Sequence, residues 1–198
     1  NHPKGEVYPG YRNRLFQREE VDGIEVIRLW TFVTANEGFI KRTLNYLSFM
    51  ISVMIALPFL PKADVCISTS PQFFCGLAGY FYSRFKRTRW ILEVRDLWPE
   101  SIVAVGAINN KRIIAALEWV ERFAYTRAHH IVVVTDAFKR FIVGKKIDSA
   151  KIDVIKNGVD LQFFSKLESE NSLAKEYQLT NKFVASYVGT HGMAHHLE

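Results

Sequence analysis

Two charged residues, Arg95 and Asp96, directly follow residues 89–94, which are predicted to form a strand. A carboxylate in this position can orient a hydroxyl group or accept its proton, and a guanidinium can bind a phosphate. The alternative is structural, with Asp96 forming an ion pair or capping the backbone around Trp98 and Pro99. Both roles stay open for the two residues, and Glu100 is a further candidate.

A second group of candidate residues lies near the carboxyl terminus, where residues 183–188 are predicted to form a strand that leads into Gly189, His191 and Gly192. Backbone N–H groups in a glycine loop that opens a helix can bind phosphate. A plain strand-to-helix turn explains the same residues, so the glycines alone do not define a site.

Three residues near the amino terminus complete the candidates. Tyr11 and Arg12 combine an aromatic face with a cation, which would suit a sugar diphosphate, although a surface loop is an equal alternative. Asn36 precedes a long apolar segment and could contact a substrate, whereas a turn is the simpler interpretation.

Strand-like and helix-like segments alternate along the chain, which predicts an α/β fold with a doubly wound parallel sheet and helices on both sides. The wholly apolar strand 130–135 is expected to be buried on both faces. Ser70 and Pro71 predict a helix start, as do Thr135 and Asp136. Ligands bind at the carboxyl ends of parallel strands, so residues 69–71, 95–96, 135–136 and 157–158 are candidate positions. The predicted strands cover 25–30, 64–69, 89–94, 130–135 and 152–155, and the predicted helices cover 39–57, 70–84 and 110–126.

Residues 44–60 carry no charge over seventeen positions, slightly fewer than the about 20 needed to span a bilayer. Asn45, Ser48 and Ser52 fall on one stripe of this helix, which we expect to face solvent while the rest packs in the core. Lys41 and Arg42 lie at its amino end, where the helix dipole disfavours cations, and this suggests contact with lipid phosphate.

The net charge of +6 over 198 residues favours an anionic partner: phosphates, nucleic acid or an acidic membrane surface. No nucleic-acid motif is present, and no nucleic-acid partner is expected. The two cysteines, Cys66 and Cys75, are predicted to be buried free thiols in a reducing compartment. The adjacent pairs of histidines have poor spacing for chelation, so no metal is expected.

Four segments together resemble the bacterial retaining glycosyltransferases of family 4, which have the two-domain GT-B fold. Within that family they are most similar to the O-antigen and capsule subgroup that includes N-acetyl-L-fucosamine transferases. The segments are residues 1–12 (Asn-His-Pro-Lys-Gly and Tyr-Pro-Gly-Tyr-Arg), 93–101 (Glu-Val-Arg-Asp-Leu-Trp-Pro-Glu-Ser), 155–163 (Ile-Lys-Asn-Gly-Val-Asp and Phe163) and 187–198.

The resemblance implies that residues 1–157 form an acceptor-side Rossmann-like domain that lacks its first strand and helix. Residues 158–198 would then be the crossover and the start of a nucleotide-sugar-binding domain, and such a piece is not expected to transfer sugar alone. The implied catalytic residue is Asp96, and the implied acceptor-binding residues are Arg95, Glu100, Asn36, Tyr11 and Arg12. The implied donor-binding residues are Gly189, His191 and Gly192.

The implied reaction moves a sugar from a nucleotide diphosphate to a polyprenyl-diphosphate-linked acceptor at the cytoplasmic face of the inner membrane, without metal or cofactor. Two alternatives stay open. A dinucleotide oxidoreductase would share the sheet but needs a Gly-x-Gly-x-x-Gly turn, which this chain lacks. A non-enzymatic basic domain on an anionic membrane surface would share the charge.

Overall fold

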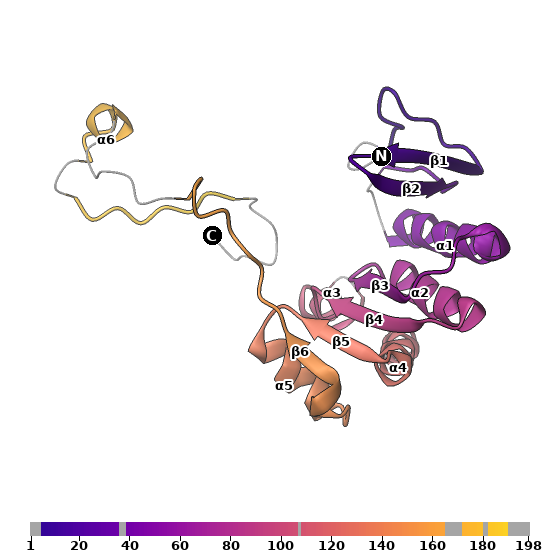
Figure 1. The fold of residues 1–198 in the computed structure, drawn as a ribbon. Helices are drawn as coiled ribbons and strands as arrows, with labels where there is room; N and C mark the ends of the chain where they lie inside the picture. Colours follow the sequence, from indigo (N-terminus) through magenta and orange to yellow (C-terminus); the bar gives the residue numbers. More distant parts are fainter. Residues whose placement is uncertain (1–4, 36–38, 107, 165–171, 180–181, 190–198) are drawn as a thin grey trace. The chain divides into compact units, whose positions relative to one another are not determined.

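The computed structural model describes residues 5–35, 39–106, 108–164, 172–179 and 182–189. The chain divides into two compact units, Asn1–Lys156 and Asn157–Glu198, which are described separately (Figure 1). The sequence predicts a domain boundary at residue 157, and the functional role assigned to each part stays a prediction.

The first unit is built on a four-stranded parallel sheet whose order, β3-β4-β5-β6, follows the order of the chain (Figure 1). A helix connects each strand to the next, which confirms the predicted α/β, Rossmann-like parallel sheet. The strands are β3 (Val65–Ser70), β4 (Arg89–Val94), β5 (His130–Val133) and β6 (Ile152–Val154). The helices are α2 (Phe73–Lys86), α3 (Glu100–Ala104), α4 (Lys111–Arg127) and α5 (Asp136–Gly144), and the 3-10 turn η2 (Ser149–Lys151) precedes β6.

The core lies on one face of this sheet. Alternate strand residues, among them Trp90, Ile131 and Ile152, are fully buried against α2, α4 and α5. Because crossovers are right-handed and the strand order never reverses, all three helices fall on the same side. The predicted placement of helices on both sides of the sheet is therefore not found within the described residues. Within the described residues the other face is open, and Ile67 is 67% exposed there. The prediction that strand 130–135 is buried on both faces is therefore wrong for this part of the chain.

A separate two-stranded sheet precedes the parallel one. β1 (Phe16–Val21) and β2 (Ile24–Leu29) pair antiparallel around Asp22 and Gly23, whose φ angles of 52° and 78° are those of a tight hairpin turn. The strand predicted over 25–30 exists, but it belongs to this hairpin and not to the strand–helix alternation. Asp-Gly between two β-prone runs is the sequence signal for such a hairpin.

The long apolar helix is α1 (Phe39–Ala56), which continues into a 3-10 turn, η1 (Leu57–Phe59). Val53 and Leu57 pack with Ala78 of α2 in a second small core. The polar stripe does not face solvent as predicted. Asn45 Nδ2 donates to the carbonyl of Phe32 at 2.5 Å, and Ser48 Oγ accepts from the Phe32 N–H at 2.8 Å, so the stripe binds the segment that follows β2.

Two predicted helix starts have different outcomes. Thr135 caps α5 as expected, because its hydroxyl accepts a hydrogen bond from Phe138 N at 3.2 Å. Ser70 is not a cap: it is the last residue of β3, and α2 begins at Phe73. The carbonyl of Ser70 accepts a hydrogen bond from Arg95 N at 3.3 Å, so it is engaged between the strand ends and does not accept the first bond of a helix.

Replacement by alanine is expected to have opposite effects on stability at two glycines of α2, Gly76 and Gly79. A Cβ at Gly79 would lie 2.5 Å from Ser68 Oγ and 2.8 Å from Trp90 Nε1, whereas at Gly76 the nearest atom is 3.6 Å away. We expect Gly79→Ala to lower the free energy of unfolding by about 1–3 kcal/mol through overpacking. Gly76→Ala should be neutral or raise it by up to about 1 kcal/mol. Urea denaturation of both variants checks this, and equal shifts would contradict the packing described here.

The second unit is described over residues 157–164, 172–179 and 182–189. It contains the short helix α6 (Ser172–Glu176) and a turn in which Asp160 Oδ1 accepts from Gln162 N at 2.9 Å. Residues 183–188, predicted as a strand, are not in one. A strand needs a neighbouring strand, and the described residues of this unit offer none, so Phe183 and Val188 are each 96% exposed.

Candidate functional site

A pocket of about 210 Å³ opens at the carboxyl ends of β3 and β4, where parallel α/β sheets bind ligands. We call it the strand-end pocket. Its walls come from α1, from the β3–α2 connection with the start of α2, and from the β4–α3 connection with the start of α3. The lining residues are Arg42, Thr43, Tyr46, Pro71, Gln72, Phe73, Phe74, Asp96, Trp98, Ser101 and Ile102.

Asp96 contributes a carboxylate to this pocket. The backbone N–H of Arg95 donates to Ser70 O at 3.3 Å, which ties the end of β4 to the end of β3 and places the next residue at the pocket. Asp96 is half-buried, and within the described residues its side chain makes no hydrogen bond or ion pair. Pro99, not Asp96, precedes α3, and no side chain caps that helix. The helix-cap alternative for Asp96 is therefore not what the structure contains.

A cation and an aromatic surface share the pocket with Asp96. Arg42 enters from the first turn of α1, although the sequence suggested only lipid contact for it. The rings of Trp98 and Phe73 lie 5.1 Å apart and hold the β4–α3 connection against α2. Pockets that bind small molecules combine such apolar walls with a few polar groups. An unexplained cation at the start of α1 was the feature of the sequence from which Arg42 could have been predicted. No feature of the sequence pointed to Gln72 or Ser101 as pocket residues.

The other described acceptor-side candidates of the first unit lie outside the strand-end pocket. Arg95 is exposed, and Glu100 contacts Lys145. Tyr11 and Arg12 are exposed in the segment before β1, where the guanidinium of Arg28 lies 4.8 Å from the centre of the Tyr11 ring. Of the candidates Asp96, Arg95, Glu100, Tyr11 and Arg12, only Asp96 therefore lines the pocket.

The donor-side candidates belong to the second unit. Of these, His191 and Gly192 lie outside the described residues, and so does Asn36, an acceptor-side candidate of the first unit. Gly189 is described, and the nearest atom to a Cβ placed on it would be the hydroxyl oxygen of Tyr187, 2.9 Å away. Their predicted roles stay predictions.

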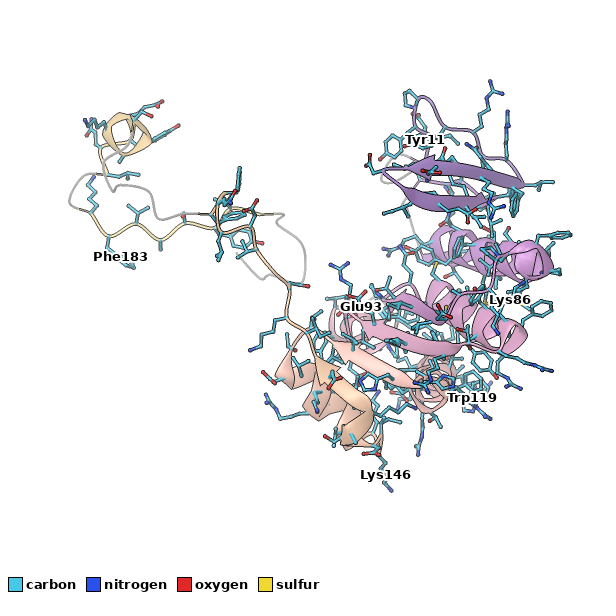
Figure 2. The ribbon with its side chains drawn as sticks, in the orientation of Figure 1. Tyr11, Lys86, Glu93, Trp119, Lys146 and Phe183 are labelled. Carbon is cyan, nitrogen blue, oxygen red and sulfur yellow. The ribbon has the colours of Figure 1, made fainter. Side chains whose placement is uncertain are left out.

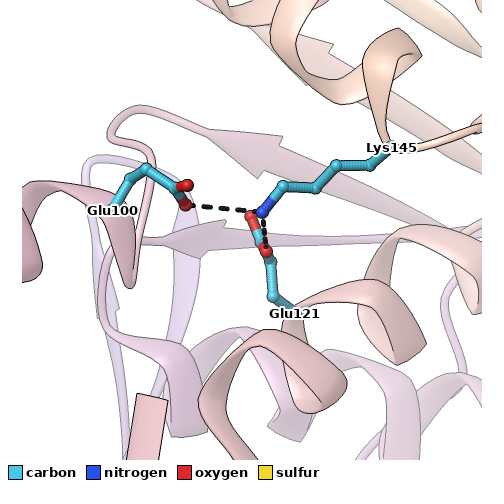
Figure 3. Close-up of polar contacts among 3 residues, drawn as sticks. All are labelled: Glu100, Glu121 and Lys145. Atoms are coloured by element: carbon cyan, nitrogen blue, oxygen red, sulfur yellow. Dashed lines mark hydrogen bonds and ion pairs between the residues drawn. The ribbon is translucent and has the colours of Figure 1, made fainter. Parts of the chain in front are cut away.

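An ion-pair cluster beneath the β4–α3 connection was missed by sequence reasoning. Lys145, which follows α5, places its Nζ 2.5 Å from Glu121 Oε2 of α4 and 3.4 Å from Glu100 Oε2 of α3 (Figure 3). Glu121 is 1% exposed, and its burial raises the pKa of the carboxyl group while the ammonium of Lys145 opposes that rise. Burial and the neighbouring Glu121 also raise the pKa of Tyr125. The cluster joins three helices and fixes the start of α3 beside the pocket.

A larger cavity of about 610 Å³ runs between α1, α2 and β3, which is an edge strand of the sheet within the described residues. It contains Cys66 and Cys75, which are free and half-buried rather than fully buried as predicted. Burial raises the pKa of each thiol to about 11, so both are protonated at neutral pH and poor nucleophiles. The cavity runs along the side of β3 and does not lie at the ends of several strands. We therefore assign it no substrate.

Within the part of the chain that is described, no group of three His, Cys, Asp or Glu side chains could hold a metal ion. His129 and His130 instead serve the fold. His129 Nδ1 accepts from Trp90 N at 3.1 Å, and His130 Nε2 lies 2.7 Å from Asp153 Oδ2.

The fold is that of a Rossmann-like α/β protein with a pocket at its strand ends. Residues 7–158 match the family described as a glycosyl transferase 4-like domain, and the chain belongs to this family. A comparison with curated proteins finds no match. The family makes the chain part of a glycosyltransferase, with a sugar donor and an acceptor as its substrates.

Proposed function

We propose that the first unit forms the acceptor-binding side of a retaining GT-B glycosyltransferase that builds bacterial surface polysaccharide. The donor is a nucleotide-diphosphate sugar, and the acceptor is a sugar carried on a polyprenyl diphosphate at the cytoplasmic face of the inner membrane. The observation that carries the proposal is the strand-end pocket, which places the free carboxylate of Asp96 and the guanidinium of Arg42 within one lining.

In the proposed reaction, Asp96 orients the acceptor hydroxyl and accepts its proton. The acceptor oxygen bonds to the anomeric carbon as the bond to the diphosphate oxygen breaks, on the same face of the sugar. The positive charge that develops on the sugar ring and the negative charge on the leaving diphosphate both need stabilisation. Gly189, His191 and Gly192, the predicted donor-binding residues, would supply backbone donors to that diphosphate.

Arg42 takes the phosphate-binding role that the sequence suggested for Arg95. It lines the pocket, whereas Arg95 is exposed outside it. Family membership also decides between the alternatives left open above, because it favours sugar transfer over a dinucleotide oxidoreductase or a non-enzymatic domain.

The proposal is tested with the full-length gene product, a lipid-linked sugar acceptor and a panel of nucleotide sugars. Mass spectrometry of the lipid fraction should show a product heavier by one sugar with at least one donor. Neither transfer nor donor hydrolysis with any donor would contradict the proposal.

Substitution of the two arginines separates their predicted roles. A hydrogen bond to a charged group contributes about 1.5–3 kcal/mol, so Arg42→Gln should raise the acceptor KM by roughly tenfold or more. Arg95→Gln should change the acceptor KM by less than about twofold, because an exposed charge outside the pocket contributes little to binding. Steady-state kinetics with varied acceptor checks both, and the reverse pattern would return the role to Arg95.

A further inference from the structure

One face of α1 is apolar and has no partner among the described residues. Ile40, Leu44, Ile51 and Ile55 recur at helical spacing, and all four are exposed. Ile40 and Ile55 are 74% and 71% exposed, and Phe59 continues the surface at 76%. We call these five residues the outer face of α1. A contiguous apolar surface of this kind marks a site of interaction.

The outer face is distinct from the surfaces that α1 uses inside the protein. Val53 and Ala56 are buried, and Val53 packs against α2. Asn45 and Ser48 bind the backbone of Phe32, and Ser48, four residues after Leu44 and three before Ile51, forms one border of the outer face. The segment Ile40–Phe59 is long and apolar enough to cross a bilayer by composition, with a mean hydropathy of 1.3. Its contacts with α2 and with the backbone of Phe32 hold it within the fold instead.

The charges around the outer face fit an anionic surface. None of residues 38–63 is acidic, and Lys41 and Lys62 are exposed near its two ends. Lys86, labelled in Figure 2 at the end of α2, places its Nζ 3.4 Å from the carbonyl of Pro58. Phe85 beside it is 54% exposed, and the ammonium of Lys86 lies 5.4 Å from the centre of its ring. Apolar side chains bordered by lysines are the pattern of a helix that lies in a lipid interface.

We propose that the outer face of α1, with Lys41, Lys62 and Lys86 at its border, docks the protein onto an anionic lipid bilayer without spanning it. The apolar side chains enter the headgroup–acyl boundary, and the lysines bind lipid phosphate. Membrane docking through α1 rests on the proposed function, because it would bring the enzyme to its lipid-linked acceptor. Vesicle binding needs no sugar transfer, so each of the two can fail while the other holds.

The test is sedimentation of the full-length protein with vesicles of phosphatidylcholine alone or mixed with phosphatidylglycerol. We expect binding to the mixed vesicles, and a loss of about tenfold in partitioning for Ile55→Glu, which places a charge in the apolar layer. Ile24→Glu is the matched control, since Ile24 in the β1–β2 hairpin is 67% exposed, and it should bind as the unaltered protein does. Lys41→Glu/Lys62→Glu should weaken binding to mixed vesicles by about tenfold or more, because each charge near the surface contributes about 1 kcal/mol.

Three results would overturn the docking proposal. The first is no binding to either vesicle. The second is an equal loss of binding for Ile55→Glu and Ile24→Glu. The third is a dimer in light scattering that Ile55→Glu dissociates, which would assign the outer face to a second copy of the chain.

Discussion

Asp96→Asn is expected to lower kcat for sugar transfer by about 10²–10⁴-fold in the full-length enzyme, the range that a positioned acid–base group contributes. Asparagine keeps the size of the side chain and one acceptor oxygen, but its NH2 group replaces the second oxygen, and the amide cannot take the proton of the acceptor hydroxyl. Steady-state transfer to the lipid-linked acceptor, with the melting temperature measured alongside, checks the prediction.

The fold should tolerate this change, because the Asp96 carboxylate makes no hydrogen bond or ion pair within the described residues. Asp22→Asn is the matched control. Asp22 has a φ of 52° in the hairpin turn, a conformation that asparagine adopts readily, so activity and stability should both be retained. A kcat within tenfold of the unaltered enzyme, about 1.4 kcal/mol, would remove Asp96 from the chemistry.

Lys145→Met is expected to lower the free energy of unfolding by about 3–5 kcal/mol at neutral pH, because it leaves the buried carboxylate of Glu121 without its cation. Glu121 is 1% exposed, and only Lys145 and Glu100 share its ion-pair cluster among the described residues. Chemical denaturation of the variant measures the loss.

The pH dependence of that loss has a definite sign. Burial raises the pKa of Glu121 in the folded protein, and removing Lys145 removes a contact that lowers it. A group whose folded pKa is raised stabilises the fold when protonated and loses that contribution as pH rises through the folded pKa. The stability that Lys145→Met loses should therefore be larger at about pH 8 than at about pH 5. The lower pH is close to the pKa of about 4.3 that a glutamate has in the unfolded chain.

A double variant separates the lost cation from lost packing. Glu121→Gln/Lys145→Met carries neither charge, so it should recover most of the stability that Lys145→Met loses at neutral pH and show little pH dependence. A double variant as unstable as the single one would mean that Lys145 acts through the packing of its side chain and not through its charge.

The elements with strong local signals were predictable from the sequence. Strand 89–94, the helix that ends near Arg127 and the Thr135 cap each depend on neighbouring residues alone, and each is found. Ser70 was mistaken for a helix cap because serine before proline is a local signal for a helix start. Its pairing with Val94 in the sheet, which is a tertiary contact, makes it the last residue of β3 instead.

Tertiary context decided what the sequence could not. Ser48 and Asn45 of α1 were expected to face water, but they satisfy the backbone of Phe32, and an apolar side of the helix is exposed instead. Arg42 and Asp96 are more than fifty residues apart, and only the packing of α1 on α2 brings them to one pocket. The Lys145–Glu121 pair joins two helices whose charged residues look like ordinary solvated positions in sequence.

Location of the acceptor is the most direct test of the central claim, which is that sugar acceptors bind at the ends of β3 and β4. A lipid-linked sugar carrying a photoreactive diazirine would be bound to the full-length enzyme and crosslinked, and the labelled peptides identified by mass spectrometry. The strand-end pocket predicts labels within residues 42–46, 71–74 or 96–102 that excess unlabelled acceptor removes. Labels confined to other parts of the chain, with the same competition, would contradict the account.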